Sequence, residues 1–393
     1  MSKVGTREYD LILRPDKDSG HVQWYYFMVA NVRKNVSYVI NIVNFVKNKS
    51  LYNQGLKPLL YSTKDADRKK IGWKRAGSRC VYYSRGNRYT LTFTIEFDHD
   101  RDVCFLAHCY PYVYTDLQLF LSSLENDVSR KKTVLRKELC RSLAGNQVDL
   151  LIISDDPQNW QKNSKQSIFL TARVHPGETQ ASWAMQGCIE FLTSNSPEAL
   201  FLRQKYNFFV VPMLNPDGVI NGHYRCSLAG QDLNRIWQNP DFTRHPCIWH
   251  TKNLMKNLLS KKLIFFCDFH GHSTKKNAFM YGCDPNACFP GKVPVHQWKN
   301  PNSPCNFPMI MNEISTAFSF QDCDFRMHKS KLTTGRVVVY REFGITQSYT
   351  FEVSFLGHKI SDNMVHFNIT DLLQLGQHFG LAFMKLLCSC ESG

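Results

Sequence analysis

Long apolar runs and leader features are missing from this 393-residue chain. No run approaches the roughly 20 apolar residues that a membrane-spanning helix needs, and the start, MSKVGTREYD, lacks the apolar core of a signal peptide. None of the 14 cysteines stands in a C-x-x-C pair, so the spacing of a zinc ribbon is absent too. These absences predict a soluble, intracellular protein whose cysteines are mostly free thiols.

Acidic residues are in the minority. The chain holds 33 Asp and Glu against 48 Lys and Arg, a formal net charge of +15 at pH 7. Such a surplus favours an acidic partner, which by charge alone is nucleic acid, an anionic membrane or a glutamate-rich protein. A basic surface without a specific partner is an open alternative. With 43% hydrophobic and 21% charged residues and no internal repeats, the composition is that of a globular protein with room for two domains.

The chain changes character near residue 112. Up to about Tyr110, short segments rich in aromatic and β-branched residues alternate with turn residues, as in HVQWYYFMVANV and YTLTFTIEF. Residues 1–112 are therefore predicted to form an antiparallel β-sandwich that supports the rest of the chain or orients a substrate. Residues 113–393 alternate helices with apolar strands, among them IFLTARV, KLIFFCDF, RVVVY and SYTFEVSF. This pattern predicts an α/β domain with a mixed, mainly parallel sheet flanked by helices.

The stretch IFLTARVHPGETQASWAMQG, residues 168–187, organises this second domain. An apolar strand ends at a Pro-Gly turn and a helix follows, so His175 and Glu178 lie at the carboxyl end of a strand, where open α/β sheets bind ligands. Their spacing lets both reach one ion. The best candidate for a third ligand is His270, which follows another apolar run. Two histidines, a carboxylate and a fourth position left for water form the ligand set of a catalytic zinc site.

Two further segments offer catalytic and substrate-binding candidates. Glu352 projects from SYTFEVSF on the face opposite to the apolar side chains. This fits either an exposed edge strand or a general base whose pKa is raised by a dry pocket. Arg225, Asn234 and Arg235 lie on an irregular segment between two strands that deliver ligands. Beside a metal they would bind a carboxylate or an oxyanion, because a guanidinium donates two parallel hydrogen bonds.

Several motifs resemble those of a known family. HPGE, LNPDG, YRCSLAGQDLNR, DFHGHS and SYTFE, in this order, closely resemble the cytosolic carboxypeptidases, the deglutamylating branch of the zinc metallocarboxypeptidases. HVQWYYF, SLYNQGLKPLLYS and AHCYPYVYTDL are similar to the amino-terminal β-sandwich domain of that family. The likeness covers nearly the whole chain and is nearest the second and third cytosolic carboxypeptidases. It implies the zinc carboxypeptidase fold for residues 113–393.

The resemblance also implies residue roles. His175, Glu178 and His270 match the ligands of one Zn²⁺ per chain, whereas His272, in the same DFHGHS motif, does not. Arg225 matches the arginine that stabilises the oxyanion, and Asn234 and Arg235 match the pair that binds the terminal carboxylate. Asp232 matches the aspartate that hydrogen-bonds the first zinc histidine. Glu352 matches the catalytic glutamate.

The chain departs from the digestive branch of the zinc metallocarboxypeptidases. Pro176 and Gly177 stand inside the zinc motif, where that branch has an arginine, and residues 329–334 lack its mobile tyrosine. Basic residues precede Glu352 instead: Lys329, Lys331, Arg336 and Arg341. A cation at the base of the pocket would select a glutamate or aspartate side chain, and Arg336 is the preferred candidate. Solvated surface charge explains any one of the four equally well.

The resemblance implies hydrolysis of carboxyl-terminal glutamates, either gene-encoded or in polyglutamate side chains. The expected partners are the glutamate-ending or polyglutamylated tails of tubulin, microtubules and other acidic-tailed proteins, without nucleic acid or a membrane. We expect a monomer in the cytoplasm, at structures such as centrioles and cilia. Two alternatives stay open: a non-catalytic protein that binds acidic tails or nucleic acid, and a zinc amidohydrolase acting on small acylated amino acids.

Overall fold

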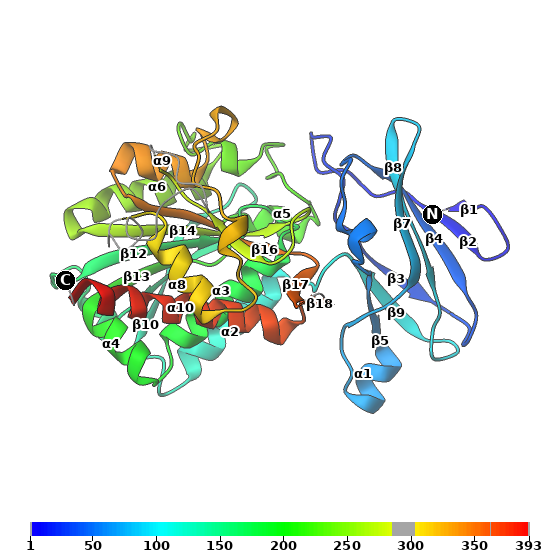
Figure 1. Ribbon diagram of the computed structural model, residues 1–393, viewed down its shortest axis with the longest axis horizontal. Coiled ribbons are helices and arrows are strands. Elements are labelled where there is room, and N and C mark those ends of the chain that lie inside the picture. Colours follow the sequence, from blue (N-terminus) through cyan, green and yellow to red (C-terminus); the bar gives the residue numbers. More distant parts are fainter. Residues whose placement is uncertain (1, 285–302, 362, 392–393) are drawn as a thin grey trace.

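The computed structural model describes residues 2–284, 303–361 and 363–391. An amino-terminal body of strands stands beside a larger body of helices and strands (Figure 1). In the described part of the chain, no helix combines the length and apolarity needed to cross a bilayer. The described cysteines from Cys80 to Cys323 are free thiols, as predicted.

The amino-terminal domain consists of two sheets. Their strands, in spatial order, are β1 (Ser2–Lys3), β2 (Glu8–Leu11), β4 (Tyr38–Phe45), β8 (Arg88–Ile95) and β7 (Ser78–Arg85) in one, and β3 (Tyr26–Ala30), β9 (Val103–Ala107), β5 (Leu59–Ser62) and β6 (Lys74–Arg75) in the other. Helix α1 (Thr63–Lys69) follows β5. The pairing is antiparallel except between β2 and β4, which run parallel. The predicted sandwich, rich in antiparallel strands, is thereby confirmed.

The alternating pattern of the strands explains why these two sheets pack together. Ile40 and Ile42 on β4 and Phe93 on β8 place their side chains on one face, as the two-residue period of a strand requires. They share a buried core with Leu60 and Leu106 from the other sheet. Apolar burial between two facing sheets therefore holds the domain together.

The larger domain is built on a seven-stranded sheet. Its strands, in spatial order, are β10 (Val134–Arg141), β11 (Gln147–Ile153), β13 (Tyr206–Val211), β12 (Gln166–Ala172), β14 (Leu263–His272), β16 (Gln347–Ser354) and β15 (Ala278–Tyr281). The central strands β13, β12, β14 and β16 run parallel, and the outer ones pair antiparallel. The predicted mixed, mainly parallel sheet is confirmed.

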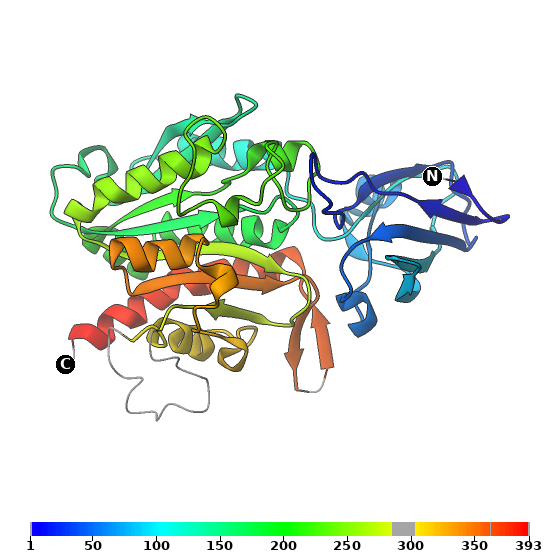
Figure 2. The same ribbon diagram turned by 90° about the horizontal axis from the view of Figure 1, so that it is seen from above.

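Helices cover both faces of this sheet (Figures 1 and 2). One face is packed by α2 (Tyr114–Asn126), α3 (Thr179–Leu192), α4 (Pro197–Lys205), α8 (Asn306–Ile314) and α10 (Ile369–Glu391), the other by α6 (Pro246–Leu258) and α9 (Gly335–Phe343). The short helix α5 (Pro216–Ile220) and the hairpin β17 (Gly357–Ile360) and β18 (Asn363–His366) complete the domain. Side chains of α2 pack with those of the large sheet. The division at residues 112 and 113 stays a prediction.

One predicted element is wrong. RVVVY, expected to be a strand, lies in helix α9, which ends at Gly344 in the left-handed conformation (φ 71°). Val337, Val338 and Val339 are consecutive and all buried, so this part of the helix shows no 3.6-residue period in the sequence. A short buried helix and a buried strand have the same apolar pattern in a sequence, and the β-branched residues favoured the strand.

Candidate metal centre and substrate pocket

Three neighbouring parallel strands bring the predicted ligands and the predicted base together. His175 follows the end of β12, His270 lies within β14, and Glu352 lies within β16. In the register of β14 and β16, His270 pairs with Glu352. Because parallel strands end at the same edge, residues far apart in the sequence meet there.

The side chains of His175, Glu178 and His270 form a compact, buried group. Each offers one ligand atom, and these atoms lie within 4.8 Å of one another. Nδ1 of His175 is 3.0 Å from Oε1 of Glu178, and Nδ1 of His270 is 3.0 Å from Oε2 of the same carboxylate. The exposed fractions are 4%, 6% and 3% in chain order. The structure therefore places the three predicted ligands where one ion can bind all of them.

The outer nitrogen of each histidine faces a second carboxylate. Nε2 of His175 lies 3.0 Å from Oδ1 of Asp232, as the resemblance implied. Nε2 of His270 lies 2.8 Å from Oδ2 of Asp268, a residue that we did not predict. Asp268 and His270 alternate on one strand and share a face, so their spacing was a usable signal. Carboxylates in this position fix the tautomer and the orientation of metal-binding imidazoles.

The donor set fits a divalent metal ion. A neutral imidazole carries one N–H, and when Nε2 donates it to Asp232 or Asp268, Nδ1 is left as an acceptor. Both Nδ1 atoms then face the oxygens of Glu178, which also accept hydrogen bonds, so a cation between them resolves the conflict. Burial opposes the charge on Glu178, but the two histidines outweigh it and hold the pKa of this carboxyl well below its usual value. The zinc ligand set of two histidines and one glutamate is met.

Glu352 is poised differently from the other carboxylates. It is 9% exposed and lines the same pocket, yet among the described residues its side chain has no hydrogen-bond or ion-pair partner. Burial raises its pKa to about 7. Strand β16 lies between β14 and β15, which excludes the alternative of an exposed edge strand. A carboxyl that exchanges a proton near neutral pH suits a general base.

Asp232 also fixes the predicted anion-binding arginine. Nε of Arg225 donates to Oδ2 of Asp232 at 2.8 Å, and Nη2 lies 2.6 Å from the same oxygen. Nη1 has no partner among the described residues. Asn234 and Arg235 follow on a 3₁₀ turn, η3 (Leu233–Arg235), and both line the pocket. The structure thus brings the predicted oxyanion and carboxylate donors to the same pocket as the ligand group.

The pocket has a volume of about 300 Å³ and a basic lining. Arg336 lies in its wall, 5% exposed, and donates through Nη1 to the carbonyl oxygen of Gly282. Lys331 lies at its rim, where partial burial and the charges of Arg235 and Arg225 lower its pKa. Of the four candidate cations, Lys329 and Arg341 do not line this pocket.

His272 also lines the pocket but does not join the ligand group. Burial lowers its pKa to about 4, and Nδ1 accepts a hydrogen bond from the backbone N–H of Lys275 at 2.9 Å. The ring packs edge-on against Phe279. The expectation that the first histidine of DFHGHS is the ligand therefore agrees with the geometry.

The amino-terminal domain contributes two charged residues that we did not predict. Asp16 accepts hydrogen bonds of 2.7, 2.7 and 2.8 Å from the backbone N–H groups of Tyr224, Arg225 and Cys226. Lys47 lines the pocket beside Tyr224. Neither residue belongs to a local motif, because only the packing of the two domains brings them to this site.

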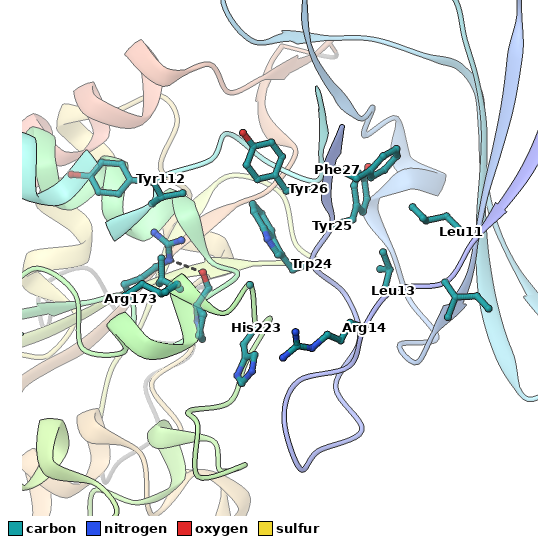
Figure 3. Close-up of a pocket in the computed structure, with 16 residues that line it drawn as sticks. Leu11, Leu13, Arg14, Trp24, Tyr25, Tyr26, Phe27, Tyr112, Arg173 and His223 are labelled. Atoms are coloured by element: carbon teal, nitrogen blue, oxygen red, sulfur yellow. Dashed lines mark hydrogen bonds between the residues drawn. The ribbon is translucent and has the colours of Figure 1, made fainter. Parts of the chain in front are cut away.

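A second cavity, of about 490 Å³, lies between the domains (Figure 3). Trp24 and Tyr26 line it from the amino-terminal domain, and Arg173 and His223 from the other. Nε of Arg173 donates to the carbonyl oxygen of Pro176 at 2.8 Å, the contact drawn as a dashed line. None of the predicted site residues lines this cavity. Through this hydrogen bond, Arg173 in the wall of the cavity stabilises the turn after His175.

Family comparisons agree with this arrangement. The model described as zinc carboxypeptidase matches residues 121–366, and the model described as cytosolic carboxypeptidase N-terminal domain matches residues 1–132. Cytosolic carboxypeptidase 2 of Homo sapiens is 46% identical over 386 residues, 96% of this chain and 42% of that protein. Cytosolic carboxypeptidase 3 of Bos taurus is 44% identical over 388 residues, 96% of this chain and 38% of that protein. The chain thus spans less than half the length of these two relatives.

Solved structures share the fold. A putative carboxypeptidase A from Shewanella denitrificans superposes with a TM-score of 0.78 at 24% identity, covering 98% of this chain and 94% of that one. A metallo-carboxypeptidase from Pseudomonas aeruginosa gives 0.76 at 22% identity, covering 99% and 96%. The chain belongs to the zinc carboxypeptidase family and carries the amino-terminal domain of its cytosolic carboxypeptidases.

Proposed function

We propose that this protein is a zinc-dependent carboxypeptidase that removes carboxyl-terminal glutamates from protein tails. One observation carries the proposal: the carboxylate of Glu352, unpaired among the described residues, lies on the strand next to that of His270, in a basic pocket that also holds His175 and Glu178. This is the set of parts needed for metal-assisted hydrolysis of a peptide bond next to an anionic group.

His175, Glu178 and His270 would hold one Zn²⁺. Zinc supplies Lewis acidity, which polarises a carbonyl and lowers the pKa of water. Asp232 and Asp268 keep the two imidazoles in the tautomer that presents Nδ1.

Glu352 and Arg225 would carry the remaining chemistry. The carboxylate of Glu352 takes the proton of the attacking water and later passes it to the leaving amine. Nη1 of Arg225 donates to the oxygen on which negative charge develops, which is worth on the order of 3 kcal/mol for one good donor. Asp232 fixes the guanidinium beforehand, so little reorganisation is needed during the reaction.

Substrate selection would rest on the basic lining. Asn234 and Arg235 would bind the terminal carboxylate, and Arg336 the side chain of the terminal glutamate. Arg336 is buried, and among the described residues no carboxylate pairs with it. An acidic side chain of the substrate would neutralise that charge. An apolar side chain would instead leave the buried guanidinium unpaired, so it would bind less well.

The natural substrates would be acidic tails, either gene-encoded or polyglutamylated, with tubulin in microtubules as the first candidate. The net charge of +15 supports this choice, because a basic surface attracts anionic chains. The protein would act in the cytoplasm, on microtubule-based structures such as centrioles and cilia.

The experiment compares wild type with Glu352→Gln on polyglutamylated tubulin and on a peptide that ends in glutamate, measuring zinc content and free glutamate. We expect one zinc per chain in both proteins, glutamate release by wild type, and a loss of at least a thousandfold in the variant. Equal release by the two proteins would refute the role of Glu352. Tail binding without release would favour a non-catalytic binder, and release only from small acylated amino acids would favour an amidohydrolase.

A further inference from the structure

Lys47 reaches the substrate pocket from the other domain. It lies just after β4, and its Nζ donates to the hydroxyl of Tyr224 and, at 2.9 Å, to Oγ of Ser273. Nζ also lies 4.5 Å from the centroid of the Tyr224 ring. These partners are uncharged, and among the described residues Lys47 forms no ion pair. Its positive charge therefore enters the pocket without a neighbouring carboxylate to balance it.

Lys47 and Arg336 line the same pocket from different domains. Arg336 lies in the first turn of α9, in the larger domain. Lys47 belongs to the amino-terminal domain and contacts Tyr224, the residue before Arg225. His175, Glu178 and His270 line this pocket too. When the terminal side chain is at Arg336, Lys47 is the cation that the amino-terminal domain offers in this pocket to the residue before it.

We propose that Lys47 selects an acidic residue immediately before the bond that is cut, so that the enzyme prefers tails ending in two or more acidic residues. This inference rests on the proposed function. An ammonium has three N–H donors, of which Tyr224 and Ser273 take two, and the third can donate to a substrate carboxylate. The amino-terminal domain would then determine specificity in addition to supporting the fold.

The surrounding charges support this assignment. The pKa of His21 is lowered by burial and by the charges of Arg225 and Lys47, against the opposing effect of Asp16 and Asp232. Arg225 and Lys47 thus place positive charge on this side of the pocket, which an acidic substrate residue would compensate.

The test uses the full zinc-loaded chain and two peptides that differ only in the penultimate residue, ending in Glu-Glu or Ala-Glu. The readout is the ratio of kcat/KM for the two peptides. Wild type should prefer Glu-Glu, and Lys47→Met, which keeps the length of the stem, should lower the ratio by about 5- to 10-fold, the size expected for a partly exposed ion pair. Lys47→Arg should keep most of the preference. The matched control is Lys49→Met, because Lys49 is exposed on the same segment and does not line the pocket.

A purely structural link between the domains predicts a different result. In that case Lys47→Met slows both peptides equally and leaves the ratio at the wild-type value, which would overturn the proposal, as would a wild type without preference. Binding of the same two peptides to Glu352→Gln, with and without Lys47→Met, gives a readout that needs no turnover. If wild type releases glutamate from neither peptide, the proposed function fails. The binding comparison then still decides whether Lys47 recognises the penultimate residue.

Discussion

Arg225 donates from Nε to Oδ2 of Asp232 over 2.8 Å. The other oxygen of this carboxylate lies 3.0 Å from Nε2 of His175 and also accepts the backbone N–H of Asn234 at 2.9 Å. One side chain therefore fixes the imidazole of His175, the guanidinium of Arg225 and the turn that carries Asn234. Burial opposes the charge on Asp232, but His175 and Arg225 outweigh it and hold the pKa of this carboxyl far below its usual value.

Asp232→Asn should weaken both zinc binding and catalysis. An amide cannot accept from His175 and Arg225 as strongly as a carboxylate does, and loss of such a partner costs about 10- to 100-fold in metal affinity. We expect that loss in a zinc competition titration with a chromophoric chelator, together with a lower kcat at saturating zinc.

Asp217→Asn provides the control for Asp232. Asp217 is a buried carboxylate of the same domain that accepts from Ser142, Ala144 and Asn146 rather than from the site. Its variant should lose stability and keep wild-type zinc affinity. Equal zinc affinity in Asp232→Asn and wild type would show that Asp232 does not support the ligand.

Glu352 should make the metal-free protein less stable as the pH rises. In the folded state burial raises the pKa of this carboxyl to about 7 from 4.5, so the folded protein retains a proton that the unfolded chain releases. The destabilisation is absent below about pH 4 and grows until about pH 7.

Glu352→Gln removes this titration. In chelator, the variant should be more stable than wild type at pH 8, by on the order of 1 to 3 kcal/mol, and the excess should be smaller at pH 4. Urea unfolding at both pH values measures the difference. Zinc should reduce the stability difference between variant and wild type at pH 8, because a nearby divalent cation favours the ionised carboxylate. A stability difference that does not change with pH would contradict the raised pKa.

Local motifs predicted which residues meet at the ends of the parallel strands. HPGE and DFHGHS each follow an apolar strand, and parallel strands end at one edge, so the meeting of His175, Glu178 and His270 followed from the order of elements. The burial of Glu352 was open, since alternation in SYTFEVSF fits both an edge strand and a central one. Only the position of β16 between β14 and β15 decided it.

The contributions of the first domain could not be predicted from the sequence. Asp16 is 209 positions from Arg225 in the chain, and Lys47 is 177 positions from Tyr224. Neither stands in a metal or catalytic motif. Their roles depend on how two separately folded domains pack, which periodicity and residue spacing do not encode. The same limit applies to α9, whose buried valines have no polar side to reveal a helical period.

Asp16→Ala should impair catalysis from outside the catalytic domain. It would leave three backbone N–H groups between Tyr224 and Cys226 without their acceptor, on the segment that carries Arg225. Hydrogen bonds to a charged group contribute about 1.5–3 kcal/mol each, so we expect a loss of roughly 3 kcal/mol in unfolding free energy after solvent reaches the segment. We also expect a lower kcat, because Arg225 would lose its fixed position.

Asp102→Ala separates this effect from a general weakening of the amino-terminal domain. Asp102 is buried there, accepts hydrogen bonds from Ser62 and Thr63, and does not line the pocket. Its variant should lower the melting temperature and keep the wild-type kcat at a temperature where the domain is folded. If Asp16→Ala behaves in the same way, Asp16 has only a structural role.

Gly187→Ala should disturb the site through helix packing. A Cβ at Gly187 on α3 would lie 1.9 Å from the carbonyl oxygen of Leu373 on α10, so the two helices would have to separate. Because α3 begins at Thr179, directly after Glu178, its displacement moves the carboxylate that faces both histidines. We expect a loss of about 1–3 kcal/mol in unfolding free energy, as for overpacked cores, together with weaker zinc binding. The control is Gly72→Ala, where a Cβ would meet nothing within 4 Å, and it should change neither stability nor zinc affinity. If Gly187→Ala is destabilised but keeps wild-type zinc affinity, α3 does not position Glu178.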